Sequence, residues 1–206
     1  MKTIKIKISI LGYWYIGTGH EAGAYADSIV LKDRDNLPFI PGKTLKGMFR
    51  NSAQMCYNNN IITENEMDVL FGVPGISLEN RPAFGIDFNN DELATSGILY
   101  FNNAELTCSE KEEIRNQNLS RHLYRIIQST AIDENGVAKD KSLRSYEVAV
   151  PLNFITSIDF EDSPKLNSTF ESEDKLKDLL KIFASFITEI GGKRRRGFGR
   201  CYVEVL

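Results

Sequence analysis

The sequence predicts an α+β fold in which helices cover one face of an antiparallel sheet. Residues 4–11 alternate isoleucines with polar side chains, which is typical of a half-buried strand, and a second alternating segment spans 201–205. Between these two segments, residues 44–56 and 172–190 carry apolar side chains at the spacing of amphipathic helices. A strand at each end, with helices and shorter strands between them, is the element order of an α+β domain.

Size and composition are those of an ordinary globular domain. The chain has 206 residues, 42% of them hydrophobic and 26% charged, which excludes a fibrous or wholly disordered protein. Charged residues alternate with isoleucine at the N-terminus, and no apolar run reaches about 18 residues, so we expect no signal peptide, no membrane association and a cytoplasmic location. Cys56, Cys108 and Cys201 are too scattered for a disulfide framework or a zinc cluster.

A glycine-rich stretch and the first helix follow the first strand. Residues 12–25 interleave glycines with aromatic side chains, which predicts a long surface loop, and long loops of this kind tend to be functional. Residues 38–42, Pro-Phe-Ile-Pro-Gly, end any regular element. The helical pattern begins directly afterwards, and we expect Thr44 to be the N-cap of this helix.

The middle of the chain predicts short strands and a hairpin. Residues 58–120 are polar and rich in asparagine, with strand-like pieces at 97–101 and 104–106. Residues 125–154 contain two apolar stretches around the turn signal Asp133-Glu134-Asn135-Gly136, which favours a long hairpin-like excursion.

The second helix is the most strongly patterned element of the sequence. Its apolar residues recur at helical spacing between Ser172 and Ile190, and Glu173 and Asp174 lie in its first turn, where acidic side chains favour the helix dipole. Gly191 and Gly192 follow it as a stop signal.

The segment between this helix and the last strand is strongly basic. Residues 193–206 hold five basic side chains and one acidic one, a local charge of +4, so the other residues carry −7 within a net charge of −3. Four glycines at 191–199 allow the backbone to approach a ligand closely, and the lysine and arginines offer forked or charged donors for phosphates. This pattern favours a polyanion site, with a solvated basic hairpin as the alternative interpretation.

A second basic cluster surrounds the start of the first helix. Lys43, Lys46 and Arg50 lie near the positive end of the helix dipole, which adds to their attraction for an anion. The glycine expected upstream in a nucleotide-hydrolase phosphate loop is replaced by Leu37, so that class is disfavoured. Gly47, inside the helix, indicates either close approach of another chain or easier helix packing.

These two segments resemble the RAMP superfamily of CRISPR-associated proteins. The likeness lies in Ile-Pro-Gly-x-x-Leu-Lys-Gly-x-x-Arg at 40–50 and Gly-Gly-Lys-x-Arg-x-Gly-Phe-Gly-Arg at 191–200, in this order and at opposite ends of the chain. It is closest to the repeated backbone subunit of type III (Csm/Cmr) effector complexes. The resemblance implies a ferredoxin-like, RNA-recognition-motif-like core in a single domain, 1–206.

The resemblance also implies how that domain is divided. The core is expected at approximately 1–57 and 154–206, with insertions at approximately 58–153. Within the insertions, a thumb-like hairpin is expected at approximately 125–152. A hairpin tip of this kind can wedge between stacked nucleotides.

Site residues follow from the same resemblance. Residues 26–33 are similar to the family segment Asp-Ser-Pro-Val-Ile-Lys-Asp, with Ile29 in place of its proline, which assigns target cleavage and a divalent metal ion, Mg²⁺ or Mn²⁺, to Asp27. Asp33 and Asp35 are the competing carboxylates. The tip of the thumb is expected to carry Ile132, Asp133 and Val137. The residues expected to contact RNA are His20, Gly42, Lys43, Thr44, Lys46, Arg50, Gly192, Lys193, Arg194, Arg195 and Arg196.

The function implied is that of a guide-RNA-binding backbone subunit whose Asp27 cuts complementary target RNA at regular intervals. Its expected partners are guide RNA, target RNA, further copies of itself in a filament and other type III effector subunits, with sequence choice left to base pairing. Two alternatives remain: a non-catalytic guide-binding subunit, and a guide-processing endonuclease that uses His20 or Tyr25 in acid–base chemistry.

Overall fold

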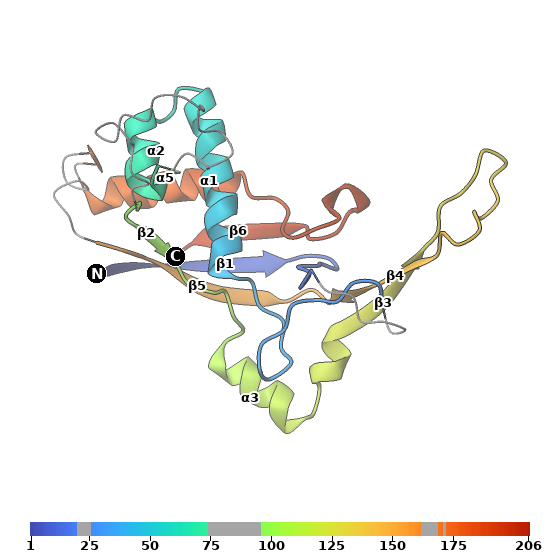
Figure 1. Cartoon of the computed structure of the whole chain (residues 1–206). Coiled ribbons are helices and arrows are strands. Elements are labelled where there is room, and N and C mark those ends of the chain that lie inside the picture. Colours follow the sequence, from blue (N-terminus) through green and yellow to red (C-terminus); the bar gives the residue numbers. More distant parts are fainter. Residues whose placement is uncertain (20–25, 74–95, 162–168, 171) are drawn as a thin grey trace, which may run out of the picture.

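A four-stranded antiparallel sheet with helices on one side forms the body of the protein (Figure 1). The computed structural model describes residues 1–206 except 20–25, 74–95, 162–168 and 171. The sheet has the order β2-β5-β1-β6, and every neighbouring pair is antiparallel. Its strands are β1 (Lys2–Ile10), β2 (Leu99–Phe101), β5 (Asn153–Phe160) and β6 (Cys201–Val205).

Two helices connect these strands in the order of a ferredoxin-like fold. Helix α1 (Gly42–Asn58) follows β1, and α5 (Glu173–Ser185) lies between β5 and β6. The core elements therefore run β-α-β-β-α-β. The first strand of each β-α-β half, β1 or β5, lies at the centre of the sheet, where the two pair with each other. The predicted α+β, ferredoxin-like architecture is confirmed.

Alternation along the central strands decides which face of the sheet is covered. Ile4, Ile6, Ile8 and Ile10 of β1 are buried, whereas the lysines between them are exposed or half-buried. The neighbouring β5 places Phe154 opposite Ile8 on the same buried face. Because successive side chains in a strand point to opposite faces, this register gives the sheet one continuous apolar surface.

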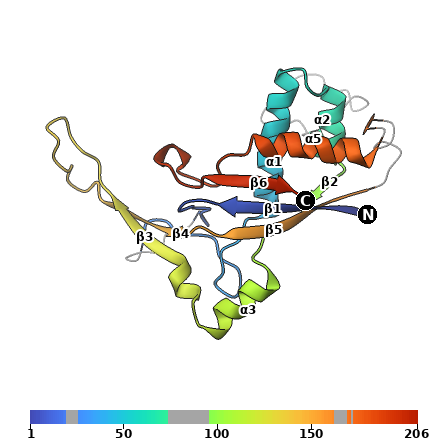
Figure 2. The same cartoon turned by 180° about the vertical axis from the view of Figure 1, so that it is seen from behind.

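Three helices cover that surface. In both views α1, α2 (Glu64–Phe71) and α5 lie on the same side of the sheet (Figures 1 and 2). Phe71 of α2 packs between Phe101 of β2 and Phe183 of α5, with ring centroids 6.3 Å apart in each pair. This aromatic contact joins helices and sheet in one apolar core.

The first helix begins two residues earlier than its sequence pattern predicts. Pro41 precedes it in an extended conformation, and the carbonyl oxygen of Pro41 accepts hydrogen bonds from the backbone amides of Thr44 and Leu45. The Gly42 amide is satisfied by the side-chain oxygen of Asn103, 2.9 Å away. The prediction of Thr44 as N-cap is therefore wrong, because a side chain distant in sequence caps this end.

The second helix ends earlier than predicted. Ser172 caps α5 through the amide of Lys175, but the helix stops at Ser185 instead of Ile190. Beyond it the chain pairs with the approach to β6, where the Ile190 amide donates to the Gly199 carbonyl oxygen at 2.8 Å. Ile190 is buried in that extended segment, so apolar spacing alone overextended the helix.

The insertions contribute a helix and a projecting hairpin. Helix α3 (Cys108–Asn116) lies on the opposite side of the sheet from the other helices (Figure 2). The 3₁₀ turn η2 (Ser120–Leu123) leads into β3 (Tyr124–Ser129), which pairs with β4 (Arg144–Ala149) in the predicted hairpin. At its tip, the Asp133 carboxylate accepts the amides of Asn135 and Val137, each at 2.9 Å. This hairpin, hereafter the thumb, extends well beyond the body (Figure 1).

Several elements differ from the sequence interpretation. Strand β5 and helices α2 and α3 were not predicted, and residues 104–106 contribute isolated bridges at Ala104 and Glu105 instead of a strand. Strand β2 lies within 58–153, the range expected to be inserted, yet it pairs with β5 in the main sheet. Across the described residues, no helix has both the length and the apolar character that spanning a membrane requires.

The environments of the three cysteines predict one reactive thiol in the native protein. Cys108 is exposed, whereas Cys56 and Cys201 are buried. Burial raises the pKa of Cys56, and burial together with the Glu189 charge raises the pKa of Cys201 to about 12. Both buried groups therefore stay as unreactive thiols at pH 8. Titration with a chromogenic disulfide reagent should modify one thiol rapidly, and all three after unfolding. Cys108→Ser should remove the rapid phase, and two rapid thiols would contradict this picture.

Candidate nucleic-acid interface at the base of the thumb

The segment that carries Asp27 pairs with the free edge of β4. The Asp27 amide donates to the Ser145 carbonyl oxygen at 2.9 Å, and the Ser145 amide donates to Oδ2 of Asp27 at 2.6 Å. One step further, the Glu147 amide donates to the Ser28 carbonyl oxygen at 2.9 Å. These hydrogen bonds hold Asp27 at the base of the thumb, with its carboxylate bonded to the backbone of β4. The Asp27 residue itself is exposed.

A buried carboxylate anchors the same segment from beneath. Glu147 is only 1% exposed and accepts the Val30 amide at 3.1 Å and the Lys32 ammonium at 2.9 Å. Lys32 also lies 3.9 Å from the centre of the Tyr124 ring. Burial, followed by the charge of Glu147, raises the pKa of Tyr124 far above its usual range, so its hydroxyl stays protonated and donates to the Asn36 carbonyl oxygen. Sequence reasoning missed Glu147, because a lone glutamate in an apolar strand gives no motif.

Close backbone packing fixes the start of the basic loop. Gly191 has φ +81°, and a Cβ there would lie 2.2 Å from the Tyr15 carbonyl oxygen, so only glycine fits. The amide of Gly192 donates to that same oxygen at 2.7 Å. The three arginines that follow form the 3₁₀ turn η3 (Arg194–Arg196), between two residues in the left-handed region, Lys193 and Gly197. All three arginine side chains are exposed.

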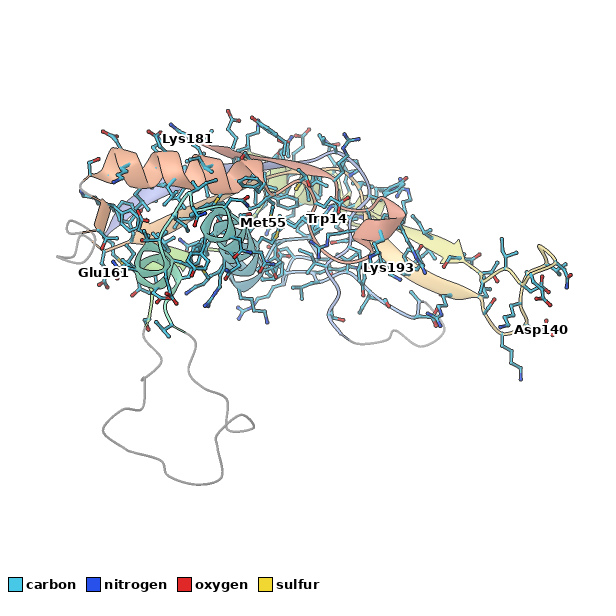
Figure 3. The ribbon with its side chains drawn as sticks, turned by 90° about the horizontal axis from the view of Figure 1, so that it is seen from above. Trp14, Met55, Asp140, Glu161, Lys181 and Lys193 are labelled. Carbon is cyan, nitrogen blue, oxygen red and sulfur yellow. The ribbon has the colours of Figure 1, made fainter. Side chains whose placement is uncertain are left out.

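The basic loop rests on β4 beside the Asp27 contact. The Lys193 ammonium lies 3.8 Å from the centre of the Tyr146 ring, and Phe198 packs edge-on against that ring at 5.9 Å. Tyr146 directly follows Ser145, the partner of Asp27. Figure 3 shows Lys193 where the basic loop meets the thumb strands. One strand thus brings together the predicted catalytic residue, the base of the thumb and Lys193, one of the predicted RNA contacts.

The predicted contacts on α1 lie elsewhere. A groove between α1 and the end of α5 is lined by Met48, Met55 and Arg194, among others. Lys43, Lys46 and Arg50 do not line it, and at 3.6 residues per turn they lie roughly 140–160° around the helix from Met48. The structure therefore separates the α1 cations from the face of α1 next to Arg194, making two basic surfaces instead of one.

Two of the predicted RNA contacts, Gly42 and Thr44, are buried or half-buried. Gly42 is buried, its amide is taken by Asn103, and a Cβ there would lie 2.0 Å from the Phe101 carbonyl oxygen. Thr44 is half-buried within the first turn of the helix. By contrast, Gly47 is exposed and a Cβ would meet nothing within 4 Å, so no contact with the described residues requires glycine there.

The remaining predicted residues divide into three groups. His20 and Tyr25 lie outside the described residues. The competing carboxylates have local partners: Asp33 accepts the amides of two residues of its own turn, and Asp35 pairs with Arg115 at 2.9 Å. The thumb tip exposes apolar side chains to solvent, with Ile132 at 67% and Val137 at 61%, beside Asp133.

The surroundings of Asp27 fit a divalent cation held in part by another molecule. The described part of the chain has no group of three or more His, Cys, Asp or Glu side chains arranged to hold a metal ion. Ser145 occupies only Oδ2 of Asp27, and no described residue donates to Oδ1. A hard cation such as Mg²⁺ commonly takes one or two carboxylates and completes its shell with phosphates and waters.

Comparison with known proteins decides the family. A family model described as the RAMP superfamily matches residues 7–202. The chain belongs to the RAMP superfamily. The family identified from the two glycine-containing motifs is therefore confirmed, and the RAMP match spans both of them.

Solved structures share the fold of this RAMP protein at low sequence identity. A chain in the cryo-EM structure of the type III-B Cmr-beta bound to cognate target RNA superimposes with a TM-score of 0.65 and 9% identity, covering 100% of this chain and 97% of that one. A chain of the type III-B Cmr-beta apo state gives 0.64 and 12%, covering 99% and 97%. No curated protein matches the sequence.

Removing the buried Glu147 carboxylate tests how firmly the Asp27 segment is anchored. Glu147→Ala leaves Lys32 without this counter-ion and the Val30 amide without its acceptor, so we expect the free energy of unfolding to fall by about 2–4 kcal/mol. Glu147→Gln keeps an acceptor for Val30 and should lose about half as much. Urea denaturation of both variants measures the difference. Equal stability of Glu147→Ala and wild type would show that the pair does not anchor the segment.

Proposed function

We propose that this RAMP protein is a guide-RNA-binding backbone subunit of a type III CRISPR effector complex that cuts complementary target RNA at regular intervals. The observation that carries the proposal is the shared use of β4. Asp27 bonds to Ser145, Lys193 packs on Tyr146, and the thumb is an extension of the same strand. A carboxylate, a cationic loop and a projecting wedge at one place are the parts such a reaction needs.

The proposed partners are guide RNA, target RNA, further copies of the chain in a filament and other type III effector subunits. Exposed Arg194, Arg195 and Arg196 supply phosphate contacts independent of sequence, which suits a subunit that leaves recognition to base pairing. The similar chains of type III-B Cmr-beta, in one case bound to cognate target RNA, support this choice of partners. Heterologous contacts that do not close generate filaments.

Asp27 is proposed to act at the phosphate that is cut. A bound Mg²⁺ or Mn²⁺ would supply charge stabilisation at that phosphate. The chain itself fixes one carboxylate oxygen of Asp27, an exposed residue, on the Ser145 amide, and no described residue donates a hydrogen bond to the other oxygen. That oxygen can hold the cation or orient the attacking 2′-hydroxyl of the RNA. The thumb, wedged between stacked nucleotides, would open the RNA beside this carboxylate.

Replacing the Asp27 charge separates cutting from binding. In the assembled complex, Asp27→Asn should slow target cleavage by at least about 100-fold, because an amide neither accepts a proton nor holds a hard cation well. Guide-RNA content should not change. The assay follows end-labelled target RNA in Mg²⁺ on a sequencing gel, where wild type should give evenly spaced products. Asp35→Asn is the matched control, since Asp35 pairs with Arg115 and should retain cleavage.

Other outcomes identify the alternatives. Unaltered cleavage by Asp27→Asn would remove Asp27 from the reaction. Guide RNA recovered with the wild-type complex, without any target cleavage, would indicate the non-catalytic subunit. Cleavage of repeat RNA by the isolated chain without metal would indicate the guide-processing endonuclease. Sequencing of RNA that copurifies from cells carrying a matching CRISPR array should show guide-length RNA.

A further inference from the structure

A cavity of about 440 Å³ opens at the base of the thumb, on the face of β4 next to the basic loop. Arg144 of β4 and Arg196 of η3 line it, together with the Tyr146 ring and the hydroxyl-bearing residues Ser129, Thr130 and Ser142. We propose that this cavity is a binding subsite for one nucleotide of an RNA strand, whose phosphate is held between Arg144 and Arg196. The inference rests on the proposed function and adds to Arg196, a predicted RNA contact, a second residue, Arg144, that no sequence motif indicated.

In the described part of the chain, neither of the two arginines has a neighbouring carboxylate as a counter-ion. Among the described residues, neither the Arg144 nor the Arg196 side chain makes an ion pair or a hydrogen bond. A few cations elsewhere on the surface have carboxylate partners, as Arg115 has Asp35 and Lys181 has Asp178. None of the described residues that line the cavity is acidic. Two unpaired guanidinium forks from different elements therefore meet at one opening, a geometry that suits a phosphodiester.

Hydrogen bonds within the thumb shape one side of the cavity. The β3–β4 ladder ends at the pair Ser129 and Arg144. Beyond it, the Ser142 hydroxyl lies 2.6 Å from that of Thr130 and accepts the Ala131 amide at 3.1 Å. These bonds tie the two arms of the thumb together above the opening, and the Ser142 hydroxyl also lies 2.6 Å from the Lys139 carbonyl oxygen.

Size and position agree with a nucleotide. Pockets for small organic ligands run from about 300 to 1,000 Å³, so the cavity is large enough for one nucleotide but not for a duplex. Arg144 and Tyr146 flank Ser145, whose backbone holds Asp27. A phosphate bound at Arg144 would therefore be positioned by the same strand that positions the proposed catalytic carboxylate.

Salt-dependent RNA binding tests the subsite directly. The probe is a fluorescein-labelled single-stranded RNA of guide length, and anisotropy gives Kd for the full chain across a salt series. Each lost phosphate contact should raise Kd about tenfold and reduce the slope of log K against log salt by about 0.7. Arg144→Gln/Arg196→Gln removes both donors to one phosphate, so it should weaken binding about tenfold at low salt and reduce the slope by about 0.7.

Two further variants separate the effect of the cavity on RNA binding from the effect of overall positive charge. Lys181→Gln removes one positive charge from α5, on the part of the molecule away from Lys193 and the thumb, and should leave Kd and slope unchanged (Figure 3). Ala131→Leu narrows the cavity with every cation retained, since Ala131 lines it and is exposed, and should weaken binding several-fold. Urea midpoints equal to wild type establish that the variants are folded.

The outcomes distinguish this inference from the proposed function. If Arg144→Gln/Arg196→Gln binds like wild type while Lys193→Gln/Arg194→Gln/Arg195→Gln is weakened, the subsite is wrong and RNA binding stands. If the wild-type chain shows no salt-dependent RNA binding, both fail. Loss of affinity for the single strand assigns the nucleotide to the guide. Loss seen only after a complementary strand is annealed assigns it to the target.

Discussion

Backbone pairing along both edges of β4 is the constraint on which the functional part of this protein depends. One edge pairs with β3, and the other is occupied at every second residue: Ser145 by Asp27, Glu147 by Ser28, and Ala149 by Trp14. A strand presents its amides and carbonyls alternately to its two sides, so no residue of β4 is left with an unpaired edge. The loop that carries Asp27 therefore behaves as part of a sheet.

The junction between this small sheet and the body depends on a tryptophan. Trp14 exchanges backbone hydrogen bonds with Ala149 at 2.9 and 3.1 Å, and its indole donates to the Val150 carbonyl oxygen at 2.9 Å. The ring is fully buried and meets Phe154 of β5 edge-on at 5.3 Å. Since β5 is central in the main sheet, this contact ties the base of the thumb to the apolar core and limits how far the thumb can swing.

Much of this architecture follows from patterns that are local in sequence. The alternation in β1, the start of α5 after Ser172 and the Asp133 turn of the thumb are fixed by neighbouring residues, and the sequence predicted each of them. Strand β5 also alternates, and Thr-x-x-Glu capping boxes open α2 and α3. These three elements were not predicted, although the sequence carries a local signal for each of them.

Other features depend on residues far apart in sequence. The amide of Gly42 is capped by Asn103, and Glu147 meets Lys32 across more than a hundred residues, so neither contact has a local pattern. The apolar periodicity predicted a helix longer than α5, because Ile190 is as deeply buried in the extended segment after the helix as it would be within a helix. The same distance in sequence hid Arg144, which stands alone until folding places it opposite Arg196.

A single carboxylate on a loop can act on one particular phosphate only if another part of the protein fixes its position. Errors of about an ångström in the placement of reacting groups cost large factors in rate. Here that part is β4, because Oδ2 of Asp27 accepts its Ser145 amide, while Arg144 and Tyr146 project from the adjacent positions. In the proposed reaction, the carboxylate and the phosphate contact therefore move together with the strand. The thumb extends from that same strand, so RNA that seats the thumb also sets the position of Asp27.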